Sequence, residues 1–281
     1  MTKLDDLLLL EKNGELKGFY HITDDVYFDP RCPGINRSSL ELISQNPSQF
    51  KSGIKSYDKK SLAFGKALHA RLLEPTKFFS EFVICPKFDL RTTIGKKDKE
   101  LFELNSLGKT IIDEGDFETI ELMSSHFQSH EQLKSYLQNS VNEQAMFWQD
   151  ASTGILCRAK IDMLVQNENI LIDLKTSKDS SPQGFGMAVA DYHLYAQAAF
   201  YSDGFLTVTG IYPRFLFAVL DKNMPHQVQT YELPFNLVDY GRKRYQYQLD
   251  KFKYLSENDK WFEPNEIVIP YFLTKRMEGV E

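Results

Sequence analysis

Two carboxylates and a lysine lie close together in the segment 160–177, KIDMLVQNENILIDLKTS. If this segment forms a hairpin that turns at residues 167–168, Asp162 stands directly opposite Asp173, with Cβ atoms about 4.5 to 5.5 Å apart. Strand alternation also places Lys175 beside Asp173. The segment is therefore predicted to present two carboxylates and an ammonium on one face.

A divalent cation would relieve the repulsion between these carboxylates. Two ionised carboxylates this close repel each other unless a proton or a cation lies between them, and oxygen ligands favour Mg²⁺ or Mn²⁺. Such an ion can activate water, hold a phosphate and stabilise the charge that develops on attack. Lys175 could then orient the water or stabilise the pentavalent transition state. A salt bridge on an exposed hairpin would show the same spacing, so the residues alone leave both interpretations open.

The hairpin lies within a longer run of predicted strands and helices. Alternating apolar residues predict strands, and apolar residues at spacings of three and four predict helices. The expected elements are strands at about 145–148, 155–165 and 169–176, a helix over 191–201, paired strands at 210–220 and 227–233, and a helix over 237–255. This order indicates an α/β core.

The chain before the hairpin is predicted to be mostly helical. A short strand is expected at residues 20–27, and a helix over about 61–73 carries His69. The polar segment 91–99, RTTIGKKDK, contains a glycine and is expected to form a loop that leads into amphipathic helices. Its basic residues could contact DNA or form a solvated charge run, and both interpretations remain open; they are Arg91, Lys96 and Lys97.

Three further titratable residues attract weaker hypotheses. His126 and His130 have the i, i+4 spacing of a metal pair, but no glutamate lies between them as in HExxH, so a solvated helix face is the favoured interpretation. Glu143 lies near the start of the strand run. A structural role and a role supporting the site are equally compatible with its position.

Composition limits the classes of protein that the chain can belong to. A net charge of −6 argues against a protein that coats nucleic acid through bulk positive charge, although an enzyme can confine its basic residues to one channel. The three cysteines, Cys32, Cys85 and Cys157, lack CxxC spacing, so we expect buried thiols and no zinc or iron–sulfur site. The sequence shows neither a signal peptide nor a membrane span, which predicts a cytoplasmic protein.

The motifs around the hairpin resemble the PD-(D/E)XK nuclease superfamily. The matching residues are Asp162, then IDLKT at 172–176, then Gln197 and Tyr201 in YHLYAQAAFY. Within the superfamily, the chain is most similar to the exonuclease VIII group of phage and prophage recombination nucleases. The resemblance extends upstream through INRSSLELISQNPSQF, GKALHARLLEP and NEQAMFWQDASTGILCRAKID, and covers most of residues 20–205 in the family's order.

The resemblance implies a role for each matched residue. Asp162 and Asp173 match the metal-binding carboxylates, and Lys175 matches the catalytic lysine. His69 matches the histidine on the preceding helix that completes the metal shell. Leu174 matches the position whose backbone carbonyl faces the metal.

Two residues on the helix after the hairpin complete the implied site. Gln197 and Tyr201 lie four residues apart on one helical face, which suits them to fix the lysine or to contact the phosphate backbone. Asp173 stands where the family often has glutamate. Its shorter side chain would shift the metal slightly but remains a competent ligand.

The resemblance also implies a fold. We expect an α/β protein with a PD-(D/E)XK, restriction-endonuclease-like core, in which helices flank a mixed sheet and further helices are added. A single nuclease domain would span residues 1–281. Its parts would be a mostly helical region at about 20–140 with His69, the catalytic sheet and helix at about 141–235, and a C-terminal helix and tail at about 236–281.

The implied activity is removal of one strand from the end of linear double-stranded DNA. The family implies 5′ to 3′ polarity, Mg²⁺ as cofactor with Mn²⁺ as a substitute, and single-stranded tails as product. The implied partners are DNA ends, identical subunits in a ring and a single-strand annealing protein. The implied setting is the cytoplasm of a bacterial host, with a phage or prophage gene.

Two alternatives remain, one within the nuclease superfamily and one from another class of function. A Cas4-like or other nuclease of the superfamily, including an endonuclease, is one, although the chain lacks the four-cysteine cluster of the iron–sulfur versions. A catalytically silent DNA-binding module is the other. Retention of Asp162, Asp173 and Lys175 argues against it.

Overall fold

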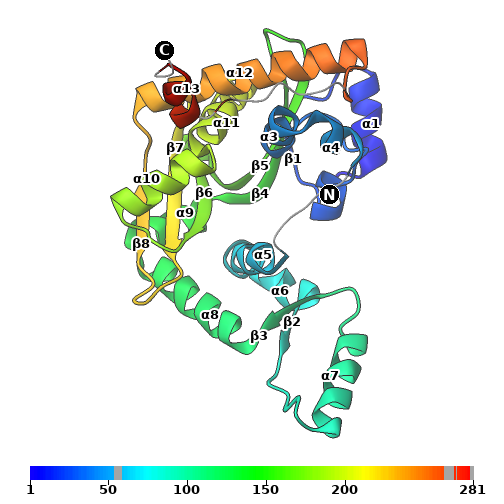
Figure 1. Ribbon diagram of the computed structural model, residues 1–281, viewed down its shortest axis with the longest axis vertical. Helices are drawn as coiled ribbons and strands as arrows, with labels where there is room; N and C mark the ends of the chain where they lie inside the picture. The colour runs from blue at the N-terminus through cyan, green and yellow to red at the C-terminus, as the bar shows by residue number, and fades with distance from the viewer. Residues whose placement is uncertain (54–58, 263–268, 270, 279–281) are drawn as a thin grey trace.

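A mixed sheet forms the centre of the protein (Figure 1). The computed structural model describes residues 1–53, 59–262, 269 and 271–278. Among these residues six strands pair in the order β1-β4-β5-β6-β7-β8, with β6 and β7 parallel and the other neighbours antiparallel. The strands are β1 (Gly18–Tyr20), β4 (Val141–Gln149), β5 (Leu156–Val165), β6 (Ile170–Ser177), β7 (Arg214–Asp221) and β8 (Val228–Tyr231).

Helices cover both faces of the sheet. The helices in chain order are α1 (Leu4–Lys12), α2 (Asp24–Tyr27), α3 (Arg37–Gln45), α4 (Pro47–Lys51), α5 (Lys59–Leu73), α6 (Pro75–Glu81), α7 (Thr93–Asn105), α8 (Glu114–Ser129), α9 (Glu131–Asn139), α10 (Pro182–Asp191), α11 (Leu194–Thr209), α12 (Phe235–Asn258) and α13 (Tyr271–Glu278). One apolar core joins the sheet to α5, α8 and α9, and another joins it to α3, α11 and α12. The predicted α/β fold, a mixed sheet flanked by helices, is confirmed.

Alternation along β6 distributes its side chains between the two cores. Ile170, Ile172 and Leu174 pack in the core with α5, whereas Leu171 packs in the core with α11. Because both faces are covered, β6 is a nearly continuous apolar strand. Asp173 interrupts this apolar run, and it is only 5% exposed.

The β5–β6 hairpin has the predicted register but a shorter ladder. Its pairs run from Val165↔Ile170 to Met163↔Ile172 and then stop. Beyond this point β5 continues beside β4, while β6 continues beside β7. The two strands therefore separate just before Asp162 and Asp173 and leave a fork in the middle of the sheet.

A small lobe extends from the body through α6, α7 and two short parallel strands, β2 (Phe82–Cys85) and β3 (Thr110–Asp113) (Figure 1). The predicted loop over 91–99 is wrong for most of its length, because α7 begins at Thr93. The Thr92 hydroxyl caps the helix by accepting the Gly95 N–H at 3.0 Å. Gly95 serves close packing, since a Cβ there would lie 2.2 Å from the Asp89 carbonyl oxygen.

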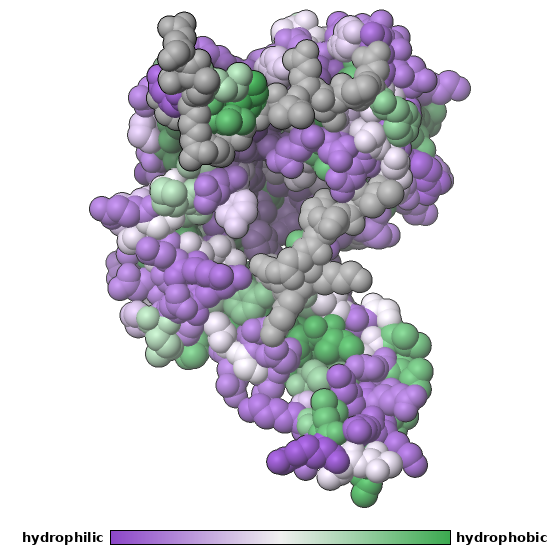
Figure 2. Space-filling view, in the orientation of Figure 1, coloured by the Kyte–Doolittle hydropathy of each residue, from purple (hydrophilic) through white to green (hydrophobic). Residues whose placement is uncertain are grey.

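Hydrophobic surface gathers on this lobe in the space-filling view (Figure 2). Exposed apolar side chains on α7 include Ile94, Leu101 and Leu104. The basic residues for which both a DNA contact and a solvated charge run were considered share this lobe, and Arg91 pairs with Asp89. No helix among the described residues is long and apolar enough to cross a bilayer.

Two local predictions also differ from the structure, and one helix has no predicted counterpart. The strand expected at 20–27 is the strand β1 followed by the helix α2. The helix α10 was not predicted, although Ser181 caps it and Pro182 occupies its first turn. α11 begins at Leu194 rather than near residue 191, because His193 adopts a left-handed conformation with φ of 51°.

Candidate active site

The fork between β5 and β6 brings the Asp162 side chain against the backbone of the neighbouring strand. The Leu174 N–H donates to Asp162 Oδ2 at 2.7 Å. A side-chain oxygen thus accepts an N–H that a continuing ladder would pair with a backbone carbonyl. This bond holds the carboxylate at the point where the strands separate.

His69 approaches the same point from α5. Its Nδ1 lies 3.7 Å from Asp162 Oδ1, and its Nε2 lies 3.2 Å from the Leu174 carbonyl oxygen. The neighbouring Leu68 is fully buried, so this part of the helix is anchored in the core. The imidazole and the two predicted ligands on the strands are therefore in mutual contact.

Asp173 lies on the other arm of the fork and has partners of its own. Gln197 Nε2 donates to Asp173 Oδ1 at 2.5 Å, and Lys175 Nζ forms an ion pair with Asp173 Oδ2. Tyr201, one turn after Gln197 on α11, has a hydroxyl that interacts with the Gln197 amide. The structure thus brings Lys175, Gln197 and Tyr201 together around one carboxylate.

Glu143 joins the site as a third acidic residue beside His69 and Asp162. One ligand atom from each of these three residues lies within 4.8 Å of the others. The β4–β5 register places Glu143 opposite Asp162. The sequence held a signal for this position, because counting back from the turn at 150–154 sets the register of the two strands.

Burial raises the pKa of Asp162 to about 7. Desolvation is the largest cause, and the negative charges of Asp173 and Glu143 raise the pKa further, whereas His69 and Lys175 lower it. Burial likewise raises the pKa of Tyr201 well above its usual range, so its hydroxyl stays protonated. The positive charge near Asp162 therefore does not offset the free-energy cost of burying its ionised carboxylate.

The residues present suit a divalent cation. Carboxylate oxygens from Asp162 and Glu143, the Leu174 carbonyl and the His69 imidazole form a mixed oxygen and nitrogen donor set, which is compatible with Mg²⁺ and more so with Mn²⁺. A cation there would stabilise the ionised form of Asp162, whose pKa is raised mainly by burial.

Other candidates lie outside this cluster. His126 Nδ1 contacts the His226 carbonyl oxygen at 2.9 Å, and its neighbour His130 serves as the N-cap of α9. Cys32 and Cys157 are buried thiols, as expected, whereas Cys85 is half-buried.

Comparisons with known proteins agree with the fold. A family model described as "PDDEXK-like domain of unknown function (DUF3799)" matches residues 44–267. The crystal structure of a Eubacterium rectale protein, described as "Putative exonuclease", superposes with a TM-score of 0.62 at 12% identity, over 93% of this chain and all of that one. A crystal structure of SSO0001 superposes with a TM-score of only 0.31 at 14% identity, over 68% of this chain and 85% of its own. No curated protein matches the chain.

Proposed function

This chain belongs to the PDDEXK-like domain family, and we propose that it is a divalent-metal-dependent exonuclease that removes one strand from the end of linear double-stranded DNA. The fold is that of the PD-(D/E)XK nuclease superfamily, and a structural neighbour is described as an exonuclease. The observation that carries the proposal is the fork, in which the cluster of His69, Glu143 and Asp162 lies beside the Asp173–Lys175 ion pair.

The residues of the fork can divide the work of phosphodiester hydrolysis. Asp162, Asp173, His69 and the Leu174 carbonyl would hold Mg²⁺ or Mn²⁺. When bound, the ion supplies Lewis-acid activation of water and stabilises charge on the phosphate.

Lys175 supplies the positive charge that the protein itself contributes at the reacting phosphate. Its ion pair with Asp173 Oδ2 keeps the ammonium at the fork. From there it can orient the attacking water or offset the negative charge of the pentavalent transition state. Gln197 fixes the other oxygen of Asp173, so the carboxylate keeps a single orientation.

The finer features of the proposal follow from the resemblance to the exonuclease VIII group. They are 5′ to 3′ polarity, single-stranded tails as product, a ring of identical subunits, a single-strand annealing partner, and phage or prophage origin. Each can be tested separately from the chemistry of the site.

The deciding experiment compares end-labelled linear duplex with covalently closed circular duplex, each with Mg²⁺ or with excess EDTA. We expect the linear duplex to be degraded from its ends and the circles to be spared, with both DNAs intact in EDTA. Labels on the 5′ and 3′ ends report the polarity. Undiminished cleavage in EDTA would contradict metal dependence, and rapid nicking of circles would indicate an endonuclease instead.

A further inference from the structure

Glu143 adopts a backbone conformation that glutamate rarely takes. Its φ is 53°, within a strand whose neighbouring residues Asn142 and Gln144 pair regularly with β5. Such a left-handed residue costs about 1 to 3 kcal/mol and persists where surrounding structure holds it in place. The distortion occurs opposite Asp162, where it brings a second carboxylate beside His69.

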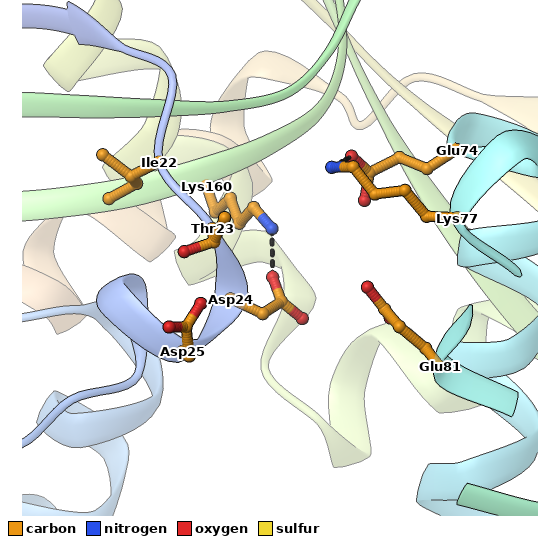
Figure 3. Close-up of a pocket in the computed structure, with 8 residues that line it drawn as sticks. All are labelled: Ile22, Thr23, Asp24, Asp25, Glu74, Lys77, Glu81 and Lys160. Atoms are coloured by element: carbon orange, nitrogen blue, oxygen red, sulfur yellow. Dashed lines mark hydrogen bonds and ion pairs between the residues drawn. The ribbon is translucent and has the colours of Figure 1, made fainter. Parts of the chain in front are cut away.

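Lys160 forms an ion pair with the Glu143 side chain. It lies on β5 two residues before Asp162, its side chain is 11% exposed, and its Nζ lies 2.7 Å from Glu143 Oε2. The same ammonium pairs with Asp24 on α2 (Figure 3). Lys160 is therefore fixed between a surface carboxylate and a carboxylate of the site.

An acidic cleft lies beside Lys160. This cleft has a volume of about 290 Å³ and contains more carboxylates than lysines; it is lined by Ile22, Thr23, Asp24, Asp25, Glu74, Lys77, Glu81 and Lys160. Lys77 already pairs with Glu74 across the cleft from Asp24 (Figure 3). Asp24 therefore anchors Lys160 on the cleft side, and Lys160 contacts a single oxygen of Glu143.

We propose that Glu143 is a further ligand of the divalent cation and that Lys160 is the positioning residue that aims it, with Asp24 as the outer anchor. The inference rests on the proposed function, whose ligand set it extends. A carboxylate has two oxygens, so Glu143 can bond to Lys160 through Oε2 and offer the other oxygen to the cation.

For Lys160, a role in positioning Glu143 and a role in neutralising its charge predict opposite changes in cation affinity. If Lys160 orders Glu143, its removal weakens cation binding, as loss of residues that orient metal ligands typically costs 10- to 100-fold in affinity. If Lys160 merely neutralises Glu143, its removal frees a carboxylate and tightens cation binding. A purely structural salt bridge would change the unfolding midpoint and leave the affinity unchanged.

The test is calorimetric titration of Mn²⁺ into the full-length protein without DNA, so that no cleavage enters the readout. Glu143→Gln and Lys160→Met should each raise the Mn²⁺ Kd by about 10- to 100-fold, and Lys160→Arg should restore most of the affinity. The double variant should lose little more than either single variant, because both act through one carboxylate. Asp24→Asn, an exposed change, should give a smaller loss in the same direction. Lys77→Met is the matched control and should bind Mn²⁺ as the wild type does.

The outcomes separate this inference from the proposed function. Wild-type affinity or tighter binding in Lys160→Met overturns the positioning role alone, provided that Asp162→Asn abolishes binding. Absence of Mn²⁺ binding in the wild type overturns both proposals. If Lys160→Met does not fold, Lys160→Arg and Asp24→Asn decide the question, and unchanged affinity in Asp24→Asn then contradicts the anchor.

Two substitutions at position 143 test whether the backbone strain serves the site. Glu143→Gly removes the ligand and relieves the left-handed conformation, whereas Glu143→Ala removes the ligand and keeps the strain. Both should lose Mn²⁺ affinity equally. Without metal, the glycine variant should melt roughly 2 to 4 °C above the alanine variant. Equal melting of the two variants would show that the carboxylate is not held by a strained backbone.

Discussion

The two arms of the fork hold carboxylates in contrasting surroundings: Asp162 on β5, the Asp162 arm, and Asp173 on β6, the Asp173 arm. Asp173 has Lys175 and Gln197 as partners, whereas Asp162 has Glu143 and His69 as close neighbours. Lys175 pairs directly with Asp173. Among the described residues no lysine or arginine pairs with Asp162, and burial raises its pKa to about 7. We therefore expect the cation to lie nearest Asp162, with Asp173 as a ligand that also holds the protein's own positive charge, Lys175, at the fork.

Asp162→Asn and Lys175→Ala should separate the two arms most clearly. Each should lower the cleavage rate by about 100-fold or more, because each removes charge that acts on the transition state. Asp162→Asn should also abolish Mn²⁺ binding, whereas Lys175→Ala should preserve it. Calorimetry and single-turnover cleavage measure the two effects on the same samples.

Lys178→Ala provides a control. Lys178 is exposed and lies one residue beyond the end of β6, the strand that carries Lys175. It should cleave at nearly the wild-type rate. Equal losses of metal binding in Asp162→Asn and Lys175→Ala would contradict a division of labour between the arms.

The Asp173 arm could be predicted from sequence because its geometry is local. A tight hairpin fixes which residues face each other, and the predicted register is the observed one. Alternation then defines where Lys175 lies. The end of the ladder could not be predicted, since it depends on β6 following β7 while β5 follows β4.

The Asp162 arm depends on contacts that are distant in sequence. His69 meets Leu174 across 105 residues, and only the family resemblance indicated that contact. The β4–β5 register places Glu143 opposite Asp162, but residue type does not encode the left-handed backbone found there. Lys160 and Asp24 meet across 136 residues, so neither was identified as part of the site from sequence.

The stability of the metal-free protein should fall as the pH rises from about 4 to about 7. The folded-state pKa of Asp162 is raised to about 7, so in this range the folded protein keeps a proton that the unfolded chain releases. The contribution is fully present below the unfolded pKa and is lost as the pH passes the folded one. Each unit of pKa difference corresponds to roughly 1.4 kcal/mol.

Urea denaturation at several pH values measures this slope. Saturating Mn²⁺ should flatten it, because the cation favours the ionised carboxylate, and Asp162→Asn should flatten it without metal. If the stability of the metal-free protein instead rises between about pH 4 and pH 7, Asp162 is not the carboxylate that needs a cation.

His69→Ala should weaken the use of metal more than the affinity for DNA. The imidazole lies against both Asp162 and the Leu174 carbonyl, so its loss should raise the Mn²⁺ concentration for half-maximal cleavage by roughly 10-fold. The change should be larger with Mn²⁺ than with Mg²⁺, since nitrogen ligands favour Mn²⁺. Duplex binding measured in Ca²⁺ should change little, and an unchanged metal titration would assign His69 to packing.

The smallest effects should come from Gln197 and Tyr201, the two α11 residues beside Asp173. Gln197→Leu removes the donor to Asp173 Oδ1, a charge-assisted hydrogen bond of about 1.5 to 3 kcal/mol, and should lower the rate by roughly 10-fold while Mn²⁺ affinity on the Asp162 arm persists. Tyr201→Phe removes a hydroxyl that interacts with the Gln197 amide, so a loss of about threefold is expected from a neutral bond. Because burial keeps the pKa of Tyr201 well above its usual range, the hydroxyl does not titrate in the assay, and the pH profile of Tyr201→Phe should match that of the wild type. A shifted profile, or a loss as large as that of Lys175→Ala, would instead make Tyr201 a direct contact of the reacting phosphate.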